Sequence, residues 1–195
     1  MTRGPGSGSG SEETEVGVPN STGTLRRRRP AHVARCSGVR DVVAAVQTAS
    51  KVNATNAAAA AASAALRVTP VGAHNSWSVL GDATGGVAVE TMSLMNRVVR
   101  VERTGDTTGG VAVVQPGLTV RALIKALAAR QLCVASVPVL LDQTVAGATQ
   151  GGSHGSSLRH GTLADALVAL TVRRFASLSL SLRARFVACG HPLVT

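Results

Sequence analysis

The sequence predicts an α+β fold with a small parallel βαβ part followed by a mixed or antiparallel part. Three patterns support this prediction. Up to about residue 72, short valine-containing segments typical of strands alternate with segments of helical periodicity. Short strands separated by glycine-containing turns follow. A second amphipathic helix then leads into a glycine-rich stretch. The 195-residue chain is 45% apolar but only 2% aromatic. Valine, leucine and alanine must therefore supply most of the core.

The first part is expected to begin with a strand at residues 32–35. Ser37 follows as a candidate helix cap, and valines recur after it at i, i+3, i+4 and i+7 on one helical face. Residues 56–66 are nearly all alanine, which favours helix, and residues 67–72 have the pattern of a strand. This strand, helix, strand order favours parallel pairing with a right-handed crossover.

The second part is expected to begin with strands at residues 87–90, 98–101 and 111–115. Gly105-Asp106 and Gly109-Gly110 would supply a hairpin turn between the last two strands.

An amphipathic helix is expected next, capped by Thr119. Val120, Leu123, Ile124 and Leu127 would form its apolar face, with Arg121, Lys125 and Arg130 pointing away. After the glycine-rich stretch, residues 166–172 read as a buried strand. The sequence thus divides into a disordered basic tail at 1–30, a folded domain at 31–172 and a divergent tail at 173–195.

Charge and cysteine content limit the possible functions. The net charge of +10 is concentrated at the two ends, since residues 31–172 hold eleven basic and seven acidic residues. With so few aromatic residues for base stacking, no nucleic-acid partner is expected. Three cysteines without C-x-x-C spacing indicate neither a disulfide framework nor a zinc site.

Targeting signals are not evident in the sequence. The N-terminus lacks the apolar segment of a signal peptide, and three glutamates argue against a mitochondrial presequence. No apolar run is long enough to cross a membrane. We therefore expect a cytoplasmic protein with no signal peptide and no transmembrane segment.

Two loops of small residues are the candidate ligand site. Glycine lets a backbone approach a ligand closely, and the N–H groups that follow a strand can bind a pyrophosphate. Neither loop is a G-x-G-x-x-G or a P-loop motif. The first loop contains the candidate contacts Val71, Gly72, Ala73, His74, Asn75, Ser76 and Trp77. The second, within residues 142–163, contains Thr144, Gly147, Gly151, Gly152, Ser153 and His154.

Four segments of the chain resemble a known family. Residues 67–80 resemble the pattern R-V-x-x-x-G-x-G-H-S-W-S, and residues 92–98 resemble L-x-x-L-N-R-V. Residues 114–117 with the helix after them resemble V-x-A-G-x-x-L-x-x-L, and residues 142–163 resemble Q-T-I-A-G-A-x-x-T-G-T-H-G-T-G. These are motifs of FAD-linked oxidases of the vanillyl-alcohol oxidase type, with a PCMH-type FAD-binding domain. The resemblance is closest to the sugar-1,4-lactone and alditol oxidases.

The resemblance implies a flavin enzyme that oxidises a CH–OH group of a sugar lactone or polyol and passes electrons to O2 or another acceptor. Residues 31–172 would be part of its FAD-binding domain, incomplete at the C-terminus, with the two loops in contact with FAD. Many relatives attach FAD covalently through a histidine, but the residue in register here is Asn75. Non-covalent FAD is therefore expected; a one-residue slip would use His74 instead. No catalytic residue is assigned, because residues 173–195 do not resemble the family.

Other interpretations remain open at this stage. The chain could be a truncated, non-catalytic FAD-binding module or a basic binding module. Residues 151–155 also fit the G-x-S-x-G pattern of serine hydrolases, with Asp165 and His191 following in the required order. Trp77 could stack on adenine or fill the core. His154, His160 and Asp165 could be imagined as metal ligands, but no metal is expected.

Overall fold

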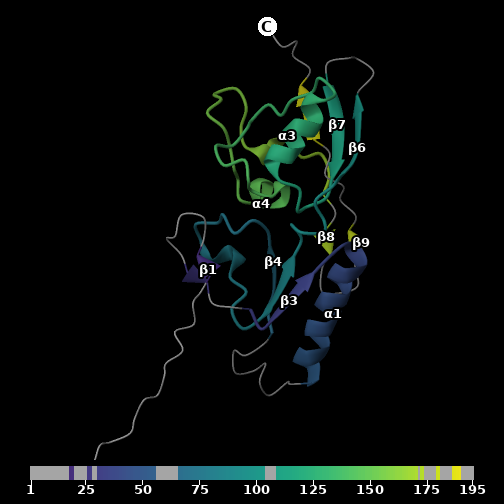
Figure 1. Ribbon diagram of the computed structural model, residues 1–195, viewed down its shortest axis with the longest axis vertical. Helices are drawn as coiled ribbons and strands as arrows, with labels where there is room; N and C mark the ends of the chain where they lie inside the picture. Colours follow the sequence, from purple (N-terminus) through teal and green to yellow (C-terminus); the bar gives the residue numbers. More distant parts are fainter. Residues whose placement is uncertain are drawn as a thin grey trace, which may run out of the picture.

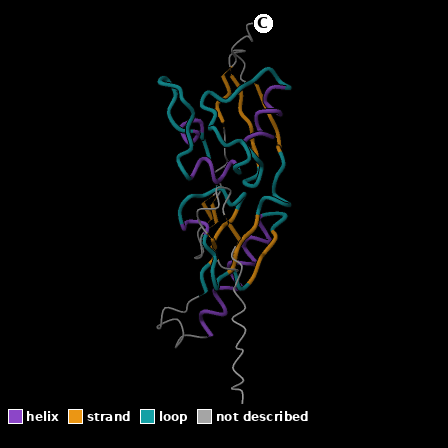
Figure 2. Tube along the Cα trace, turned by 60° about the vertical axis from the view of Figure 1, so that its left-hand side comes forward, coloured by secondary structure: helices purple, strands orange, loops and turns teal. Residues whose placement is uncertain are grey.

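The computed structural model describes residues 18–19, 26–27, 30–55, 66–103, 109–170, 172–173, 179–180 and 186–189. Two parts follow one another along the long axis of the molecule (Figure 1). One carries a parallel sheet and the other an antiparallel sheet, as the sequence predicts. Figure 2 shows strands in both parts, with loops between them.

The first part is built on a three-stranded parallel sheet in the order β3-β5-β4. Its strands are β3 (His32–Arg35), β5 (Val87–Glu90) and β4 (Val68–Val71). Parallel pairing is confirmed, but β3 and β4 each pair with β5 rather than with one another. This order was not predicted from the sequence, because β5 follows the strand–helix–strand unit in sequence but lies between β3 and β4 in the sheet. The first three residues of β5 are buried, as expected of a central strand.

Helix α1 (Val39–Thr55) packs on this sheet through a small core of Cys36, Val89 and Met95, with Val42 and Ala45 against it. Ser37 does not act as the expected cap acceptor. Its N–H and hydroxyl instead donate to the Asp41 carboxylate at 2.8 and 2.6 Å. The hydrogen bonds from Ser37 lower the pKa of Asp41. An acid in the first turn also interacts favourably with the helix dipole.

The second part contains an antiparallel sheet in the order β10-β7-β6. Strand β6 (Val98–Arg103) pairs with β7 (Gly109–Val114), which also pairs with β10 (Phe186–Cys189). Gly109-Gly110 lies inside β7 rather than in the expected turn. A Cβ at Gly110 would come within 2.8 Å of the Glu102 carbonyl oxygen on β6 and 2.6 Å of Leu132 Cδ1. Because the backbone oxygen cannot easily move, the strand needs a glycine here. Gly105-Asp106 lies outside the described residues.

Helices α3 (Val120–Ala128) and α4 (Val145–Gln150) pack beside this sheet (Figure 1). The Thr119 side chain accepts from the Ala122 N–H at 3.2 Å, which confirms the predicted cap. Leu123 and Leu127 are fully buried, and Arg121 and Lys125 are exposed. These leucines belong to the larger core cluster, whose buried members are Ala112, Leu118, Val120, Leu123, Leu127, Leu132, Val134, Val145, Ala148 and Leu163.

The buried strand expected at residues 166–172 was a wrong prediction. Residues Leu163–Ala166 form a 3₁₀-helix, η2, and the Val168 side chain is exposed. The physical reason is a capping box in which the Asp165 carboxylate accepts from both the N–H and the hydroxyl of Thr162. This local cap starts a helical turn where the apolar residues alone suggested a strand.

The remaining elements are short. A second 3₁₀-helix, η1 (Val79–Gly81), follows the first candidate loop. Strand β1 (Val18–Pro19) pairs with β2 (Arg26–Arg27) within the predicted tail, and β8 (Val172–Arg173) pairs with β9 (Ser179–Leu180). The helix expected at residues 56–66 lies outside the described residues except for Leu66, whose N–H donates to the Asn53 side chain at 2.7 Å.

Candidate functional site

The two candidate loops, far apart in sequence, touch one another in the structure. Gly72 leaves the end of β4 and lies against the side chain of Thr144. A Cβ added at Gly72 would stand 2.6 Å from Thr144 Oγ1 and 2.9 Å from its Cγ2. Both distances are shorter than real Cβ contacts, so the approach depends on glycine. The two parts of the fold thus meet at a pair of residues that the sequence assigned to one site.

Thr144 is held firmly on its side of this contact. It is buried, and its side chain caps α4 by accepting from the Gly147 N–H at 3.2 Å. The next residue, Val145, donates its N–H to the Leu118 carbonyl at 2.7 Å. Thr144 is therefore positioned by a helix cap and by the chain that leads into α3.

The first loop is exposed to solvent at His74 and Trp77, and its other residues are buried or half-buried. His74 has a φ of 54°, in the left-handed region that non-glycine residues rarely adopt. Trp77 is 72% exposed, so the interpretation of this side chain as part of the core is wrong. An exposed tryptophan beside a left-handed turn offers a flat surface for a ring.

The second loop is more ordered than its composition suggests. Residues 145–150 form α4, with Gly147 inside the helix and Gly151 as its C-cap at a φ of −85°. Gly152 follows at a φ of 67°, so among the three glycines predicted to contact the ligand in this stretch it alone adopts the left-handed conformation. Gly151 and Gly152 are both exposed.

Ser153 and His154 continue the second loop. The Ser153 hydroxyl donates to Gln143 Oε1 at 2.9 Å, and His154 Nδ1 lies 2.9 Å from the Gly155 carbonyl oxygen. Leu163 donates its N–H to the Ser153 carbonyl at 2.7 Å. The stretch is therefore folded back on itself next to α4.

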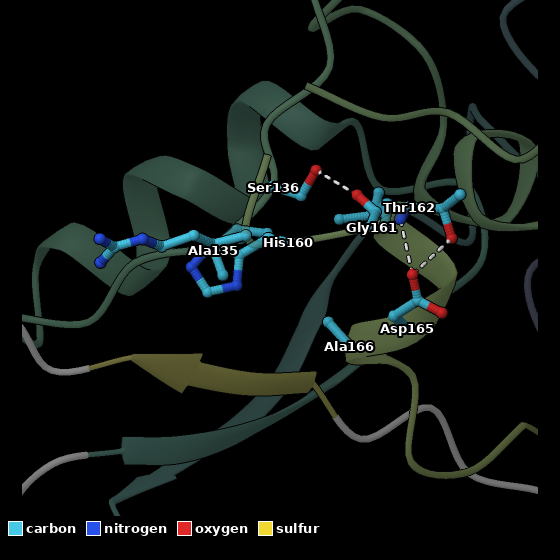
Figure 3. Close-up of a pocket in the computed structure, with 10 residues that line it drawn as sticks. Ala135, Ser136, His160, Gly161, Thr162, Asp165 and Ala166 are labelled. Carbon is cyan, nitrogen blue, oxygen red and sulfur yellow. Dashed lines mark hydrogen bonds between the residues drawn. The ribbon is translucent and has the colours of Figure 1, made fainter. Parts of the chain in front are cut away.

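Sequence reasoning did not identify Ser136, which holds this loop in place. Its hydroxyl donates to the Gly161 carbonyl at 2.7 Å (Figure 3). The same hydroxyl accepts from the Gly155 N–H at 3.0 Å. Ser136 is buried, and a Cβ at Gly155 would come within 2.7 Å of the Val137 carbonyl oxygen. A lone serine before a proline-containing segment carries no sequence signal of this role.

An ion pair between Arg121 on α3 and Asp142 holds the start of the second loop at the protein surface. Arg121 Nε and Nη2 donate to the two carboxylate oxygens of Asp142 at 2.8 and 3.1 Å. The hydrogen bond from Arg121 lowers the pKa of Asp142, and the same bond raises the pKa of Arg121. Both side chains are exposed, so this pair orients the loop more than it stabilises the fold.

A cavity of about 300 Å³ lies beside the second loop, but no predicted FAD contact lines it. Figure 3 shows Ser136, His160 and Thr162 at its wall. Its lining comprises Val134, Ala135, Ser136, Arg159, His160, Gly161, Thr162, Leu163, Asp165 and Ala166. An extended dinucleotide needs exposed backbone over a longer path than this cavity offers. Residues 159–163, at the end of the glycine-rich stretch, line the cavity, whereas the predicted FAD contacts within residues 71–77 and 144–154 do not.

A hydrolase site does not match the geometry at Ser153. A nucleophile elbow places serine between a strand and a helix, whereas Ser153 follows α4 and donates to Gln143. His191 lies outside the described residues. Within the described ranges no group of three or more metal-ligating side chains gathers. In the same ranges, no helix is both long and apolar enough to span a bilayer.

The parallel sheet, the antiparallel sheet and two small-residue loops meeting between them define a dinucleotide-binding domain of the α+β class. The family described as "FAD binding domain" matches residues 30–174, which is most of the chain. The chain therefore belongs to this family, and its cofactor is FAD.

Solved structures support the fold. Cholesterol oxidase from B. sterolicum is similar at a TM-score of 0.64 and 19% identity, with 89% of this chain and 32% of that chain covered. A VAO-type flavoprotein from Myceliophthora thermophila C1 has a TM-score of 0.63 at 14% identity, covering 80% and 31%. An alkyldihydroxyacetonephosphate synthase has a TM-score of 0.57 at 19% identity, covering 82% and 33%.

These neighbours confirm the fold of a PCMH-type FAD-binding domain. The chain spans about a third of the length of the solved structures it matches. No curated protein matches the chain. The similarities do not extend to a sugar lactone or an alditol as substrate.

The described residues fit FAD. The two loops present exposed backbone at Gly151 and Gly152, a left-handed turn at His74 and an exposed aromatic ring at Trp77. In addition, one carboxylate oxygen of Glu90, close in the fold to the first loop, is buried without a hydrogen-bond partner among the described residues. A bound group with hydroxyls and amide-like edges would satisfy such an atom.

Proposed function

We propose that the complete protein is an FAD-dependent oxidoreductase that oxidises a CH–OH group of a sugar lactone or an alditol and passes the electrons to O2 or another acceptor. FAD, when bound, supplies the chemistry by accepting a hydride from the substrate carbon. Membership of the FAD binding domain family supports the cofactor. The motif resemblance at residues 67–80 and 142–163 supports the substrate class.

The role of this chain is to hold and orient FAD. Residues 71–77 would contact the pyrophosphate through N–H groups at the carboxyl end of β4, as strand ends do in dinucleotide-binding folds. Thr144 and residues 147–154 would line the other side. Asn75 stands where many relatives carry the linking histidine, and an amide cannot form that bond, so FAD is held without a covalent link.

The observation that carries this proposal is the contact between Gly72 and Thr144. Two loops chosen for the same ligand on sequence grounds lie against one another, although 72 residues separate these two positions. A long ligand that lies across this contact would reach both loops. Either loop alone would offer only part of the surface an extended dinucleotide requires.

The test is to purify the chain, add FAD and record the visible flavin absorption of the protein after gel filtration. Retained FAD that is released into the supernatant by acid precipitation supports the proposal. Flavin that stays in the acid pellet contradicts non-covalent binding and indicates His74 as the attachment site. A protein that retains no flavin contradicts the site itself.

Trp77 gives an independent readout, since it is the only tryptophan of the chain and is exposed. FAD bound across the first loop should quench its emission in proportion to occupancy. Emission that stays constant while FAD binds would place the cofactor elsewhere.

A second candidate function is FAD binding without turnover, because the chain spans only about a third of its structural neighbours. The two functions are separated by adding sugar lactones and alditols to the FAD-loaded chain under anaerobic conditions. Bleaching of the flavin absorption indicates oxidation of the substrate. A loaded protein that no member of either substrate class bleaches is a binding module.

A further inference from the structure

Glu90 stands at the carboxyl edge of the parallel sheet, next to the strand that leads into the first loop. It is the last residue of β5, the central strand, and its register partner on β4 is Val71. Val71 directly precedes Gly72. Because neighbouring strands are about 4.8 Å apart, the end of β5 lies one strand spacing from the start of the proposed pyrophosphate loop.

The two oxygens of the Glu90 carboxylate differ in their surroundings. Oε1 accepts from the Ser93 N–H at 3.0 Å, a bond closed within the turn after β5. Oε2 is buried and has no hydrogen-bond partner in the part of the chain that the structure describes. A buried acceptor without a donor is costly, so a native structure that retains one calls for a missing partner.

The groups packed around Glu90 do not supply that partner. Cys36, which follows β3, donates its N–H to the Glu90 carbonyl at 3.0 Å, and its thiol lies 3.6 Å from the Ala34 carbonyl oxygen. Burial raises the pKa of the Cys36 thiol first, with further contributions from Asp41 and Glu90. The thiol therefore stays neutral. Arg35, the register partner of Glu90 on β3, is exposed and makes no hydrogen bond to Oε2.

We propose that Glu90 Oε2 accepts a hydrogen bond from a ribose hydroxyl in the adenosine half of FAD. This inference rests on the proposed function, since it requires FAD to bind through the loop after β4. In dinucleotide-binding folds, an acid that follows the pyrophosphate loop by about 20 residues reaches the ribose in the same manner. Gly72 and Glu90 are 18 residues apart and sit at the ends of adjacent parallel strands.

The alternative donors of FAD fit this position less well. The phosphates carry negative charge and would be repelled by the carboxylate, which places the pyrophosphate on the Gly72 side. The flavin ring would lie toward the second loop, at the far end of an extended cofactor. The ribityl chain also carries hydroxyls next to the pyrophosphate, but it joins the pyrophosphate to the flavin ring and therefore lies on the side of the second loop. The ribose, on the other side of the pyrophosphate, is the hydroxyl-bearing group that remains for Glu90.

The experiment compares Glu90→Ala with a matched control, Glu102→Ala. Glu102 is on β6, is exposed and pairs with Arg100 at 3.2 Å. Calorimetric titrations of the full chain use FAD, ADP, the 2′-deoxy and 3′-deoxy analogues of ADP, and FMN, which lacks adenosine. The stability of each apoprotein is measured by urea denaturation.

We expect Glu90→Ala to weaken FAD and ADP at least about tenfold, the usual effect of losing a hydrogen bond to a charged group. FMN affinity should stay within twofold, and the control should behave as the wild type. The wild type should bind ADP more tightly than at least one deoxy analogue, and Glu90→Ala should remove that preference. The apoprotein should lose no stability, because the substitution removes a buried unpaired oxygen and the Ser93 N–H is exposed to water.

Three results would overturn the inference while FAD still binds: unchanged ADP affinity in Glu90→Ala, an equal loss for FMN and ADP, or an apoprotein destabilised well beyond the control. The last result would give Glu90 a structural role. A wild-type chain that binds neither FAD nor ADP would instead overturn the proposed function and, with it, this inference.

Discussion

Replacing Gly72 by alanine tests whether the contact between the two loops builds the site. The described glycines with left-handed φ are Gly85 and Gly152, so the backbone at Gly72 accepts alanine. The atoms nearest to the new methyl group would belong to the Thr144 side chain, at 2.6 Å for Oγ1 and 2.9 Å for Cγ2. Thr144 is buried and capped onto α4, so it has little room to move.

The size of the effect follows from this geometry. Forcing one extra methyl into a packed contact costs about 1–3 kcal/mol. For a chain of 195 residues, each kcal/mol lowers the midpoint of thermal unfolding by about 2–4 °C. We therefore expect a decrease of about 2–12 °C, together with weaker FAD binding because the loops are pushed apart.

The assay is thermal unfolding followed by circular dichroism, with FAD titrations on the same samples. Gly38→Ala is the matched control, since a Cβ there would meet nothing within 4 Å. In a Thr144→Ala background the two closest opposing atoms, Oγ1 and Cγ2, are gone and only Cβ remains, at 3.3 Å. Gly72→Ala should then cost less than about 0.5 kcal/mol. An equal cost in both backgrounds, or no cost in either, would refute the proposed contact.

Three further predictions follow. Ser136→Ala should destabilise the chain by about 1–3 kcal/mol in urea denaturation, because two partly buried hydrogen bonds to the backbone are lost. A loss below about 0.5 kcal/mol would mean that water replaces the hydroxyl. Arg121→Leu should raise the pKa of Asp142 toward its ordinary value in an NMR titration of the carboxyl carbon, since Arg121 lowers it. In the wild type, any stability that the Asp142 carboxylate contributes is present above its ordinary pKa and is lost as the pH falls through its lowered pKa in the folded protein. A pKa of Asp142 that is the same in Arg121→Leu and in the wild type would contradict the ion pair. A maleimide should label exposed Cys133 well before Cys36, which is buried and whose thiol has a raised pKa. Mass spectrometry of the labelled peptides measures the order, and labelling of Cys36 first would contradict the prediction.

The sequence predicted those elements whose signals are local. Strand β3, the Thr119 cap and the apolar face of α3 depend on residues within a few positions of each other, and they form as expected. The secondary-structure prediction was wrong where a hydrogen bond between nearby polar side chains and the backbone favoured a different structure from the one that the apolar residues indicated. At Asp165 a capping box produced a 3₁₀ turn in place of a strand.

Contacts between residues far apart in the chain could not be predicted from the sequence, for a different reason. The two loops could be named from their glycines and hydroxyls, but only the fold brings Gly72 to Thr144. Ser136 and Glu90 carry no motif. The importance of Ser136 depends on the backbone groups that lie opposite it, and that of Glu90 on a buried oxygen whose lack of a partner only the fold reveals.

The strand order β3-β5-β4 also has a consequence for synthesis of the chain on the ribosome. Neither β3 nor β4 can form a sheet hydrogen bond of this ladder until β5, the last of the three in sequence, has emerged. About 55 residues separate the start of β3 from the start of β5, so α1 and two unpaired strands are produced before their common partner exists. This interval is when the nascent chain is most exposed to aggregation and to chaperones.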